Sequence, residues 1–313
     1  MARPDTLYVD GHAFSLLRNA DLAMYRAKAG GNARHVAFEA RMQNNILTRL
    51  EFENDLRRAI ELGEMRVYYQ PIVELESGQI VDVEALLRWQ HPTRGLVSPI
   101  DFIPIAEETG LIIPIGKWVL EEACRQAATW RAQFPNEPRL TVSVNLSPRQ
   151  FQQPALIQQI EHALSQAGLS ANSLKLEITE GMVMRDLEAT ISTLRRLRKL
   201  GIKIAIDDFG TGYSSLAYLK RLPIDIIKID RSFIQDIGQD QENTAIVRAI
   251  ISMAKALNLT VTAEGIETVE QLDLLRGWNC DRGQGYLFAR PMEAETLTAL
   301  LPLGGLETGA KAA

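Results

Sequence analysis

Acidic side chains recur in this sequence at the ends of short apolar runs, and clustered carboxylates of this kind can hold metal ions. With one lysine and one asparagine in similar runs, the candidate site residues are Glu84, Asn145, Glu177, Asp207, Asp208, Lys228, Glu264 and Glu267. A carboxylate at the end of a buried strand is costly unless it is paired or holds a cation. Because several successive strands carry one, we expect a single polar cluster at one end of a sheet. Oxygen ligands of this kind favour Mg²⁺ or Mn²⁺.

The adjacent pair Asp207-Asp208 is the sharpest local signal. Neighbouring residues on a regular strand point to opposite faces, but at a strand end the second residue can turn back toward the same cluster. Two close carboxylates repel each other, and one of them would hold a proton unless a cation compensates. The stretch Asp-Asp-Phe-Gly-Thr-Gly also suits an ordinary turn. The carboxylates at equivalent strand ends, Glu84, Glu177 and Glu264, favour a site over a turn.

Lys228 lies within an apolar, strand-like run, where a lysine must find an anion or lose its charge. It is either a structural partner of Asp230 or a neighbour, or a cation that orients a water or stabilises a phosphoryl oxygen, and the run favours neither. Glu84 and Arg88 share one face of a strand, which fits a phosphoester site with a carboxylate for metal and a guanidinium for phosphate. A surface Glu–Arg pair would give the same pattern.

Three further motifs are weaker signals. Asn145 could cap a turn or offer a neutral carbonyl ligand beside the carboxylates. The stretches Glu264-Gly265-Ile266-Glu267 and Gln284-Gly285-Tyr286 each place a glycine, which permits a tight bend, next to a polar side chain. Ordinary loop chemistry would explain either of them equally well.

The composition is that of a soluble globular protein of one large domain or two ordinary ones. The 313 residues are 46% apolar and 23% charged. The net charge of −5 argues against a general nucleic-acid binder, which would usually be basic, so we expect no DNA or RNA polymer as partner. An anionic substrate would have to be attracted locally, by metals or by a few well-placed cations.

The cysteine count and the absence of targeting signals suggest a cytoplasmic chain. Cys124 and Cys280 do not make a disulfide framework and suit a reducing compartment. No apolar run approaches the ~18 residues of a membrane helix, and no segment reads as a signal peptide. A histidine-rich zinc site is disfavoured because the histidines are scattered, at His12, His35, His91 and His162.

Strand-like and helix-like segments alternate from about residue 65, which predicts an α/β fold of the (β/α)₈, TIM-type barrel class. The predicted helices include Asp186–Leu200, stopped by Gly201, and Asn243–Leu257, with Asn243 or Thr244 as N-cap. The predicted strands are Met65–Leu75, Ile80–Trp89, Leu140–Leu146, Leu174–Thr179, Ile202–Phe209, Ile224–Ile229, Leu259–Ala263 and Gly285–Phe288.

The first two predicted strands are joined by only four residues, Glu76-Ser77-Gly78-Gln79. That loop is too short for a parallel crossover, so the first strand should be antiparallel to the second. The stretch before the barrel is different in character, with one predicted helix at Leu16–Ala29 and a charged one at Ala40–Leu62. No independent core is evident there.

Taken together, the motifs resemble those of the EAL-domain cyclic di-GMP phosphodiesterases over about residues 45–303. The motifs in question are Glu84-Ala85-Leu86, Asn145, Leu176–Glu180, Asp207–Gly212, Lys228-Ile229-Asp230, Ala263–Glu267 and Gln284-Gly285-Tyr286. Each is weak alone, but their order and spacing are similar to those of the family. The resemblance implies a barrel with an antiparallel first strand. It also implies hydrolysis of one phosphodiester bond of cyclic di-GMP to linear 5′-pGpG, which lowers the second-messenger level in bacterial signalling.

The resemblance further implies two divalent cations, Mg²⁺ or Mn²⁺. Glu84, Asn145, Glu177 and Asp207 would hold the first cation. Asp207 would bridge to the second, with Asp208 beside it. No residue departs from the family pattern at these positions, so loss of activity through a missing ligand is not indicated.

Other site roles follow from the same resemblance. Lys228 and Glu264 would contact or activate the metal-bound water. Glu267 and Gln284 would support the second metal and its surroundings.

Substrate binding and assembly are implied in the same way. Gln70 and Arg88 would position the phosphates of the dinucleotide, and Leu86 would pack near a guanine. Glu180 would anchor the loop Asp208–Ser215, which in the family links the metals to a dimer interface. A homodimer is therefore expected.

The N-terminal stretch Leu17–Lys28 resembles the last helix of GGDEF diguanylate cyclase domains. The GGDEF signature itself is absent, so this stretch cannot act as a cyclase. We expect residues 1–44 to be a remnant of such a domain with its linker, residues 45–303 to be the EAL domain, and residues 304–313 to be a flexible tail. The chain would then be the C-terminal part of a longer protein, which could be anchored in a membrane upstream.

Two other functions remain open from the sequence. One is a binding module of the same fold that senses cyclic di-GMP without cleaving it, which usually lacks a metal ligand or the lysine. The other is an unrelated metal-dependent barrel enzyme, such as an aldolase or an enolase-like lyase. The Asp-Asp-Phe-Gly-Thr-Gly loop and Arg88 favour a phosphoester over the latter.

Overall fold

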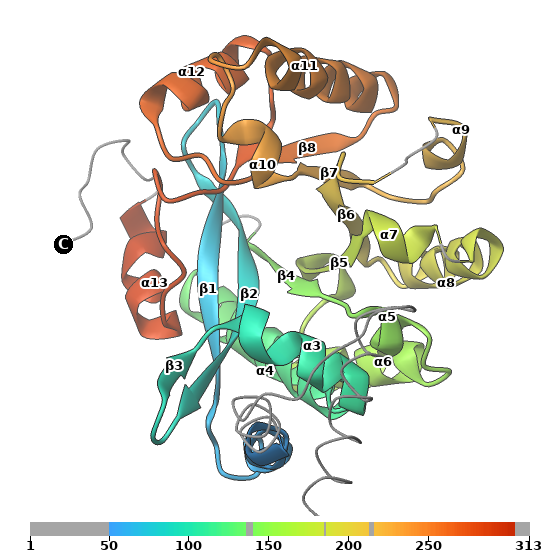
Figure 1. Ribbon diagram of the computed structural model, residues 1–313, viewed down its shortest axis with the longest axis vertical. Helices are drawn as coiled ribbons and strands as arrows, with labels where there is room; N and C mark the ends of the chain where they lie inside the picture. Colours follow the sequence, from blue (N-terminus) through green and yellow to red (C-terminus); the bar gives the residue numbers. More distant parts are fainter. Residues whose placement is uncertain (1–49, 136–139, 185, 213–215, 304–313) are drawn as a thin grey trace, which may run out of the picture. The chain divides into compact units, whose positions relative to one another are not determined.

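The computed structural model describes residues 50–135, 140–184, 186–212 and 216–303 (Figure 1). The chain divides into two compact units, residues 1–59 and 60–313. In the first unit, the described residues 50–58 are helical, so the predicted helix Ala40–Leu62 ends earlier than expected. The predicted helix Leu16–Ala29 and the tail after residue 303 lie outside the described residues.

One sheet, which closes on itself, forms the centre of the second unit. Its strands are β1 (Met65–Glu74), β2 (Ile80–His91), β3 (Gly95–Val97), β4 (Thr141–Asn145), β5 (Leu174–Thr179), β6 (Lys203–Phe209), β7 (Ile226–Ile229), β8 (Thr260–Ala263) and β9 (Arg282–Gly283). The strand order is β1-β9-β8-β7-β6-β5-β4-β2-β3, and β1 also pairs with β2. Eight strands therefore make a closed barrel, with β3 attached outside the ring, and the predicted fold class is confirmed.

The first strand is antiparallel to both of its neighbours, as predicted. β1 pairs with β2 in a hairpin that places Gln70 opposite Glu84. β1 also pairs antiparallel with β9, whereas the neighbours from β2 through β4 to β9 are parallel. The four-residue loop left no room for a crossover, so the hairpin followed directly from loop length.

Helices surround the strands of this unit (Figure 1). They are α3 (Pro99–Thr109), α4 (Ile112–Gln133), α5 (Pro148–Phe151), α6 (Leu156–Ala167), α7 (Glu180–Val183), α8 (Leu187–Lys199), α9 (Leu216–Leu219), α10 (Arg231–Ile234), α11 (Gln241–Ala256), α12 (Val269–Gly277) and α13 (Ala294–Leu300), with short 3₁₀ turns η1 (Ala171–Ser173) and η2 (Leu301–Leu303). The predicted helices Asp186–Leu200 and Asn243–Leu257 are present as α8 and α11.

The predicted N-cap of α11 is wrong. Asp240, rather than Asn243 or Thr244, caps the helix, because its side chain accepts hydrogen bonds from the backbone N–H groups of Glu242 and Asn243. Aspartate at this position satisfies two free donors of the first turn and carries the charge that the helix dipole favours. The helix therefore begins two residues earlier than expected.

The predicted last strand, Gly285–Phe288, is also wrong. The strand lies earlier, at β9, and residues 285–288 form turns. A Cβ atom at Gly285 would lie 2.1 Å from the carbonyl oxygen of Ile266, so the chain there packs backbone against backbone. The apolar Phe288 is buried by this turn rather than by a strand, which explains why its pattern was misleading.

The inside of the barrel holds a buried ion pair that the sequence analysis did not predict. Lys175 on β5 contacts the carboxylate of Asp82 on β2, and both side chains are 2% exposed. Ser143 and Thr141 on β4 donate hydrogen bonds to the same carboxylate, at 3.0 and 2.7 Å. Each charge is thus compensated in a place where an isolated charge would be very costly.

The two cysteines are free and buried, in agreement with the prediction that they form no disulfide framework. Burial raises the pKa of the Cys124 thiol, and that of Cys280, to about 12. Both thiols should therefore stay protonated at neutral pH. None of the helices in the described residues combines the length and the apolar character that crossing a membrane requires.

The buried pair generates a stability prediction. Lys175→Met should lower the free energy of unfolding by about 3–5 kcal/mol, because it leaves the Asp82 carboxylate buried without its cation. The double variant Asp82→Leu/Lys175→Met should recover most of that loss, since an apolar pair of similar volume removes both charges. Urea unfolding of the three proteins measures this, and a double variant no more stable than the single one would contradict it.

Candidate functional site

Four carboxylates from four strands or strand ends converge on the ammonium group of Lys228. The distances from Lys228 Nζ to the carboxylate oxygens are 3.2 Å for Glu84, 2.5 Å for Glu177, 3.4 Å for Asp207 and 2.6 Å for Glu264. The residues come from β2, β5, β6, β7 and the position after β8, so the cluster sits at the carboxyl ends of the parallel strands. That end of a barrel of this type is where active sites are found.

Amide side chains extend the cluster around Glu84. Asn145 Nδ2 donates to Glu84 Oε1 at 2.7 Å, and Gln284 Nε2 donates to Glu84 Oε2 at 2.8 Å. Gln284 Nε2 also lies 2.9 Å from Gln70 Oε1, and Gln70 in turn donates to the carbonyl of Ala289. Gln284 Oε1 is buried and finds no hydrogen-bond partner among the described residues. It is an acceptor left available to a ligand.

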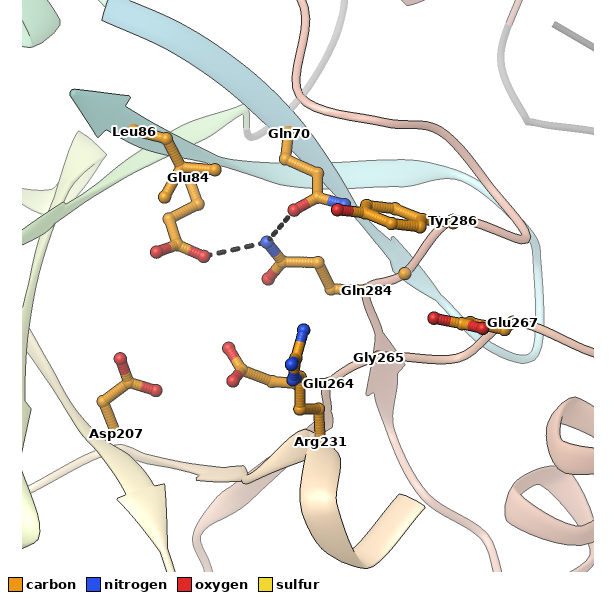
Figure 2. A pocket seen from close by; sticks show the side chains of 11 residues that line it. Gln70, Glu84, Leu86, Asp207, Arg231, Glu264, Gly265, Glu267, Gln284 and Tyr286 are labelled. Atoms are coloured by element: carbon orange, nitrogen blue, oxygen red, sulfur yellow. Dashed lines mark hydrogen bonds between the residues drawn. The ribbon is translucent and has the colours of Figure 1, made fainter. Parts of the chain in front are cut away.

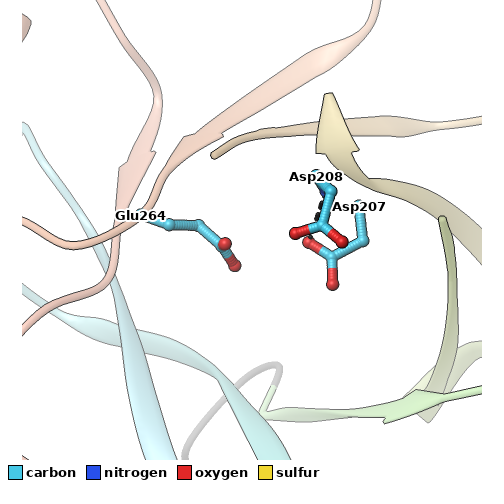
Figure 3. Close-up of side chains that lie close together, drawn as sticks. All are labelled: Asp207, Asp208 and Glu264. Carbon is cyan, nitrogen blue, oxygen red and sulfur yellow. Dashed lines mark hydrogen bonds between the residues drawn. The ribbon is translucent and has the colours of Figure 1, made fainter. Parts of the chain in front are cut away.

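Asp207 and Asp208 both reach the cluster because the strand is irregular between them. The register of β6 against β7 shifts between Ile206 and Phe209, and Asp208 has a φ of 53°. This left-handed conformation turns the second carboxylate toward the first, as the sequence analysis predicted for a strand end. Carboxylate oxygens of Asp207, Asp208 and Glu264 all lie within 4.8 Å of one another (Figure 3).

The carboxylates of the cluster outnumber its one ammonium group, and their pKa values are shifted. Burial opposes ionisation of Glu84, but Lys228 and the two amides outweigh it and hold its pKa below the ordinary value. Burial raises the pKa of Glu177 well above its ordinary value, and the neighbouring carboxylates add to this, although Lys228 counters it. Burial also raises the pKa of Glu264, to about 8. The pKa of Asp208 is raised by partial burial and by Asp207.

Lys228 stays charged at the centre of this group. Burial alone would lower the pKa of its ammonium, but the carboxylates, Asp207 foremost, raise it well above its ordinary value. One ammonium then faces five carboxylates, counting Asp208. A second source of positive charge is needed before all of them can ionise together. The donor set consists of oxygens, so these residues fit hard divalent cations such as Mg²⁺ or Mn²⁺.

Part of the cluster, including Glu84, Asp207 and Glu264, lines a pocket (Figure 2). Of the residues predicted for substrate and metals, Gln70, Glu84, Leu86, Asp207, Glu264, Glu267 and Gln284 line it. Glu267 is exposed and stands apart from the carboxylate group, and it is absent from the set of oxygens that lie within 4.8 Å. The predicted role of Glu267 at the second metal stays a prediction.

Arg88 and Glu180 belong neither to the pocket lining nor to the group of residues around Lys228. Arg88 is half-buried, with its guanidinium 5.7 Å from the ring centroid of Tyr68, and it donates to the carbonyl of Leu87. Glu180 begins α7 and accepts a hydrogen bond from Gly210 N at 3.0 Å, so it contacts the start of the loop after Asp208. Residues 213–215 of that loop lie outside the described part of the chain. The anchoring role of Glu180 stays a prediction.

Two side chains that line this pocket, those of Arg231 and Tyr286, received no role from the sequence. Arg231, the first residue of α10, lines the pocket, and it directly follows the Lys228-Ile229-Asp230 motif. Tyr286 also lines the pocket, and the guanidinium of Arg290 lies 4.2 Å from its ring centroid. A strand-end position next to a charged motif was the available signal for Arg231. Tyr286 was part of a quoted motif but received no role.

Comparison with known proteins identifies the family. The EAL domain family matches residues 53–291, and the chain belongs to this family. Similar curated proteins include two from Pseudomonas aeruginosa. The bifunctional diguanylate cyclase/cyclic di-GMP phosphodiesterase MucR is 45% identical over 284 residues, covering 91% of this chain and 41% of MucR. The cyclic di-GMP phosphodiesterase NbdA is 44% identical over 286 residues, covering 91% of this chain and 36% of NbdA.

Solved structures of similar proteins share the fold. The PaMucR phosphodiesterase in complex with c-di-GMP is 46% identical with a TM-score of 0.76, covering 79% of this chain and 99% of that one. The EAL enzyme Bd1971 with cAMP and cyclic di-GMP bound is 35% identical with a TM-score of 0.79, covering 94% and 77%. The chain spans less than half the length of the curated relatives MucR and NbdA.

The raised pKa of Glu264 predicts how stability depends on pH when metals are removed by EDTA. The folded protein holds a proton on Glu264 up to about pH 8, whereas the unfolded chain releases it near 4.5. The free energy of unfolding should therefore fall as the pH rises from about 4.5 to 8, and Glu264 should add no further change above that.

Urea unfolding across this pH range, with EDTA present, measures the effect. Glu264→Gln should show a shallower fall, because its side chain binds no proton in either state. Glu161→Gln, an exposed change on α6, serves as the matched control and should follow the parent protein. Equal slopes for Glu264→Gln and the parent would contradict the assignment.

Proposed function

We propose that this chain is a metal-dependent phosphodiesterase that hydrolyses cyclic di-GMP to linear 5′-pGpG and so lowers the level of a bacterial second messenger. The observation that carries the proposal is the cluster around Lys228, in which four carboxylates from four strands or strand ends contact one ammonium and the carboxylate of Asp208 lies beside them. The phosphodiesterase MucR and its c-di-GMP complex, at 45–46% identity, support the substrate.

The residues that would hold two divalent cations, Mg²⁺ or Mn²⁺, are Glu84, Asn145, Glu177, Asp207 and Asp208. When bound, such ions lower the pKa of a water molecule and balance the charge of a phosphoryl group. Asn145 now donates through Nδ2 to Glu84, which leaves its carbonyl oxygen as the atom available to a cation. The excess of carboxylate over ammonium charge favours cation binding at this place.

Side chains of this chain would accept the proton of the water and offset the charge that develops in the reaction. With cations bound among the neighbouring carboxylates, whose positive charge favours the ionised form, Glu264 would be suited to accept the proton of the attacking water. Lys228 stays charged, and its ammonium is suited to hold Glu264 in place and to offset the charge that develops on the phosphoryl oxygens. The water oxygen bonds to phosphorus as the bond to the 3′ oxygen breaks, and that oxygen takes up a proton.

The pocket, together with Arg88 outside its wall, would bind the dinucleotide. Gln70 and Arg88 would position its phosphates, and Leu86 would pack against a guanine. Gln284 would present its unpartnered Oε1 to the bound ligands. Glu267 would contribute its carboxylate from the rim of the pocket. An acidic chain can bind an anion in this way, because the bound cations reverse the local field.

The organisation of the longer protein belongs to the same proposal. The MucR match covers 91% of this chain and must extend before residue 53, since few residues follow residue 291. MucR is also named a diguanylate cyclase, which supports residues 1–44 as the remnant of a GGDEF domain followed by the EAL domain at 45–303. Glu180 and its loop would link the metals to a homodimer interface. The free thiols suit a cytoplasmic location.

The function is tested by incubating the protein with cyclic di-GMP and Mg²⁺ or Mn²⁺ and following the reaction by chromatography. The chain should produce pGpG, and Glu84→Ala should lose more than about 100-fold in rate, the loss that even the surroundings of a metal site can cause. Glu161→Ala, on the exposed face of α6, is the matched control and should keep full activity.

The other outcomes distinguish the rival functions. Tight binding of cyclic di-GMP without turnover in either metal would instead favour a receptor of the same fold. A chain that neither binds nor cleaves the dinucleotide would contradict the proposal and would leave an unrelated metal-dependent reaction.

A further inference from the structure

The pocket contains a cation that the mechanism above does not use. Among the described residues that line it, the acidic ones are Glu84, Asp207, Glu264 and Glu267, and Arg231 is the only basic one. Lys228 lies beneath this lining and is occupied by its four carboxylates. An anionic substrate that enters the pocket therefore meets a single guanidinium on its wall.

The fold makes a specific place for this arginine. Arg231 starts α10 directly after Asp230, whose side chain caps the helix. A Cβ atom on Gly265 would lie 2.5 Å from Arg231 Cβ, and Gly265 has a φ of 73°, which favours glycine. A side chain at position 265 would therefore collide with the side chain of Arg231, and glycine leaves room for it. Figure 2 shows it rising beside Glu264 and pointing toward Gln284.

The guanidinium has its donors available. No ion pair or hydrogen bond of the Arg231 side chain is found within the described part of the chain, and the residue is exposed. Glu264, its neighbour in Figure 2, is paired with Lys228 at 2.6 Å instead. A planar guanidinium with free donors matches two oxygens of a phosphate at once.

We propose that Arg231 binds the phosphate that is cleaved, and that it holds this phosphate after cleavage as the terminal 5′-phosphate of the linear product. The inference rests on the proposed function and names a further residue of that site. Arg231 stands beside Glu264, which belongs to the carboxylate group of Asp207 and Asp208, so it is next to the reacting phosphate. Arg88, stacked on Tyr68 outside the pocket wall, is left for the second phosphate.

The charge of the phosphate changes at this position during the reaction. A phosphodiester carries one negative charge, and a terminal phosphate carries about 1.5 to 2 near pH 7. The bond from the water oxygen to phosphorus forms, the bond to the 3′ oxygen breaks, and the 3′ oxygen takes up a proton. Arg231 should therefore bind the product phosphate more strongly than the substrate phosphate. The contribution of Arg231 can therefore be measured as the preference of the protein for a dinucleotide with a terminal phosphate over one without it.

Calorimetric titration with two linear dinucleotides in Mg²⁺ tests this. The probes are pGpG and GpG, which lacks the terminal phosphate. The parent protein should bind pGpG more tightly than GpG, and Arg231→Gln should reduce that preference by about 10- to 100-fold. Arg231→Lys should keep part of it, because a point charge replaces the fork. Arg248→Gln, an exposed arginine on α11 outside the pocket, should leave it unchanged.

A second variant tests the position of the Arg231 side chain without changing Arg231 itself. Gly265→Ala keeps the charge of Arg231 but pushes its side chain aside, so it should weaken the preference for pGpG in the same direction. Thermal unfolding of each variant checks that the fold is kept. Equal binding of pGpG and GpG by the parent protein, or an unchanged preference in Arg231→Gln, would overturn the inference.

The two proposals fail in different ways. If the parent protein prefers pGpG through Arg231 but does not cleave cyclic di-GMP, the proposed hydrolysis fails while the phosphate site stands. If it cleaves cyclic di-GMP but Arg231→Gln keeps the full preference for pGpG, only the role of Arg231 is wrong.

Discussion

The rest of the site depends on one buried ammonium group. Lys228 is 1% exposed and contacts four carboxylates that come from different strands, so it fixes where those strand ends meet. Without a cation there, the carboxylates would repel one another and would have to be protonated. One ammonium is still too little for five carboxylates: burial raises the pKa of Glu177 and of Glu264, and the neighbouring carboxylates add to this. The same deficit favours divalent cations, which links the stability of the barrel to its chemistry.

The barrel interior carries polar groups at two levels. Two residues before Glu84 lies Asp82, and two residues before Glu177 lies Lys175, and these two earlier side chains form the buried ion pair. Since side chains two apart on a strand point the same way, the pair lies on the inner side beneath the candidate site. The antiparallel β1 completes the ring and brings Gln70 opposite Glu84. The amide network around Glu84 depends on that register.

Much of this could be predicted from the sequence because strand length, loop length and charge are local properties. The hairpin followed from a four-residue loop, and the cluster followed from carboxylates at equivalent strand ends. The failures were tertiary. Gly285–Phe288 is apolar, but close packing of Gly285 against the backbone of Ile266 makes it a turn. The partner of Lys175 lies 93 residues away, so nothing local to either residue marks the pair. For Arg231 the only signal was its position next to a charged motif, because its place depends on a glycine of another segment.

The most direct test of the central claim is anomalous diffraction from crystals grown with Mn²⁺. We predict manganese peaks among the carboxylates, one contacting Glu84, Asn145, Glu177 and Asp207 and a second near Asp207 and Asp208. Crystals that show no manganese at this place, from protein that still turns over cyclic di-GMP, would contradict it. The cluster around Lys228 would then be a structural ion network, and the chemistry of this chain would lie elsewhere.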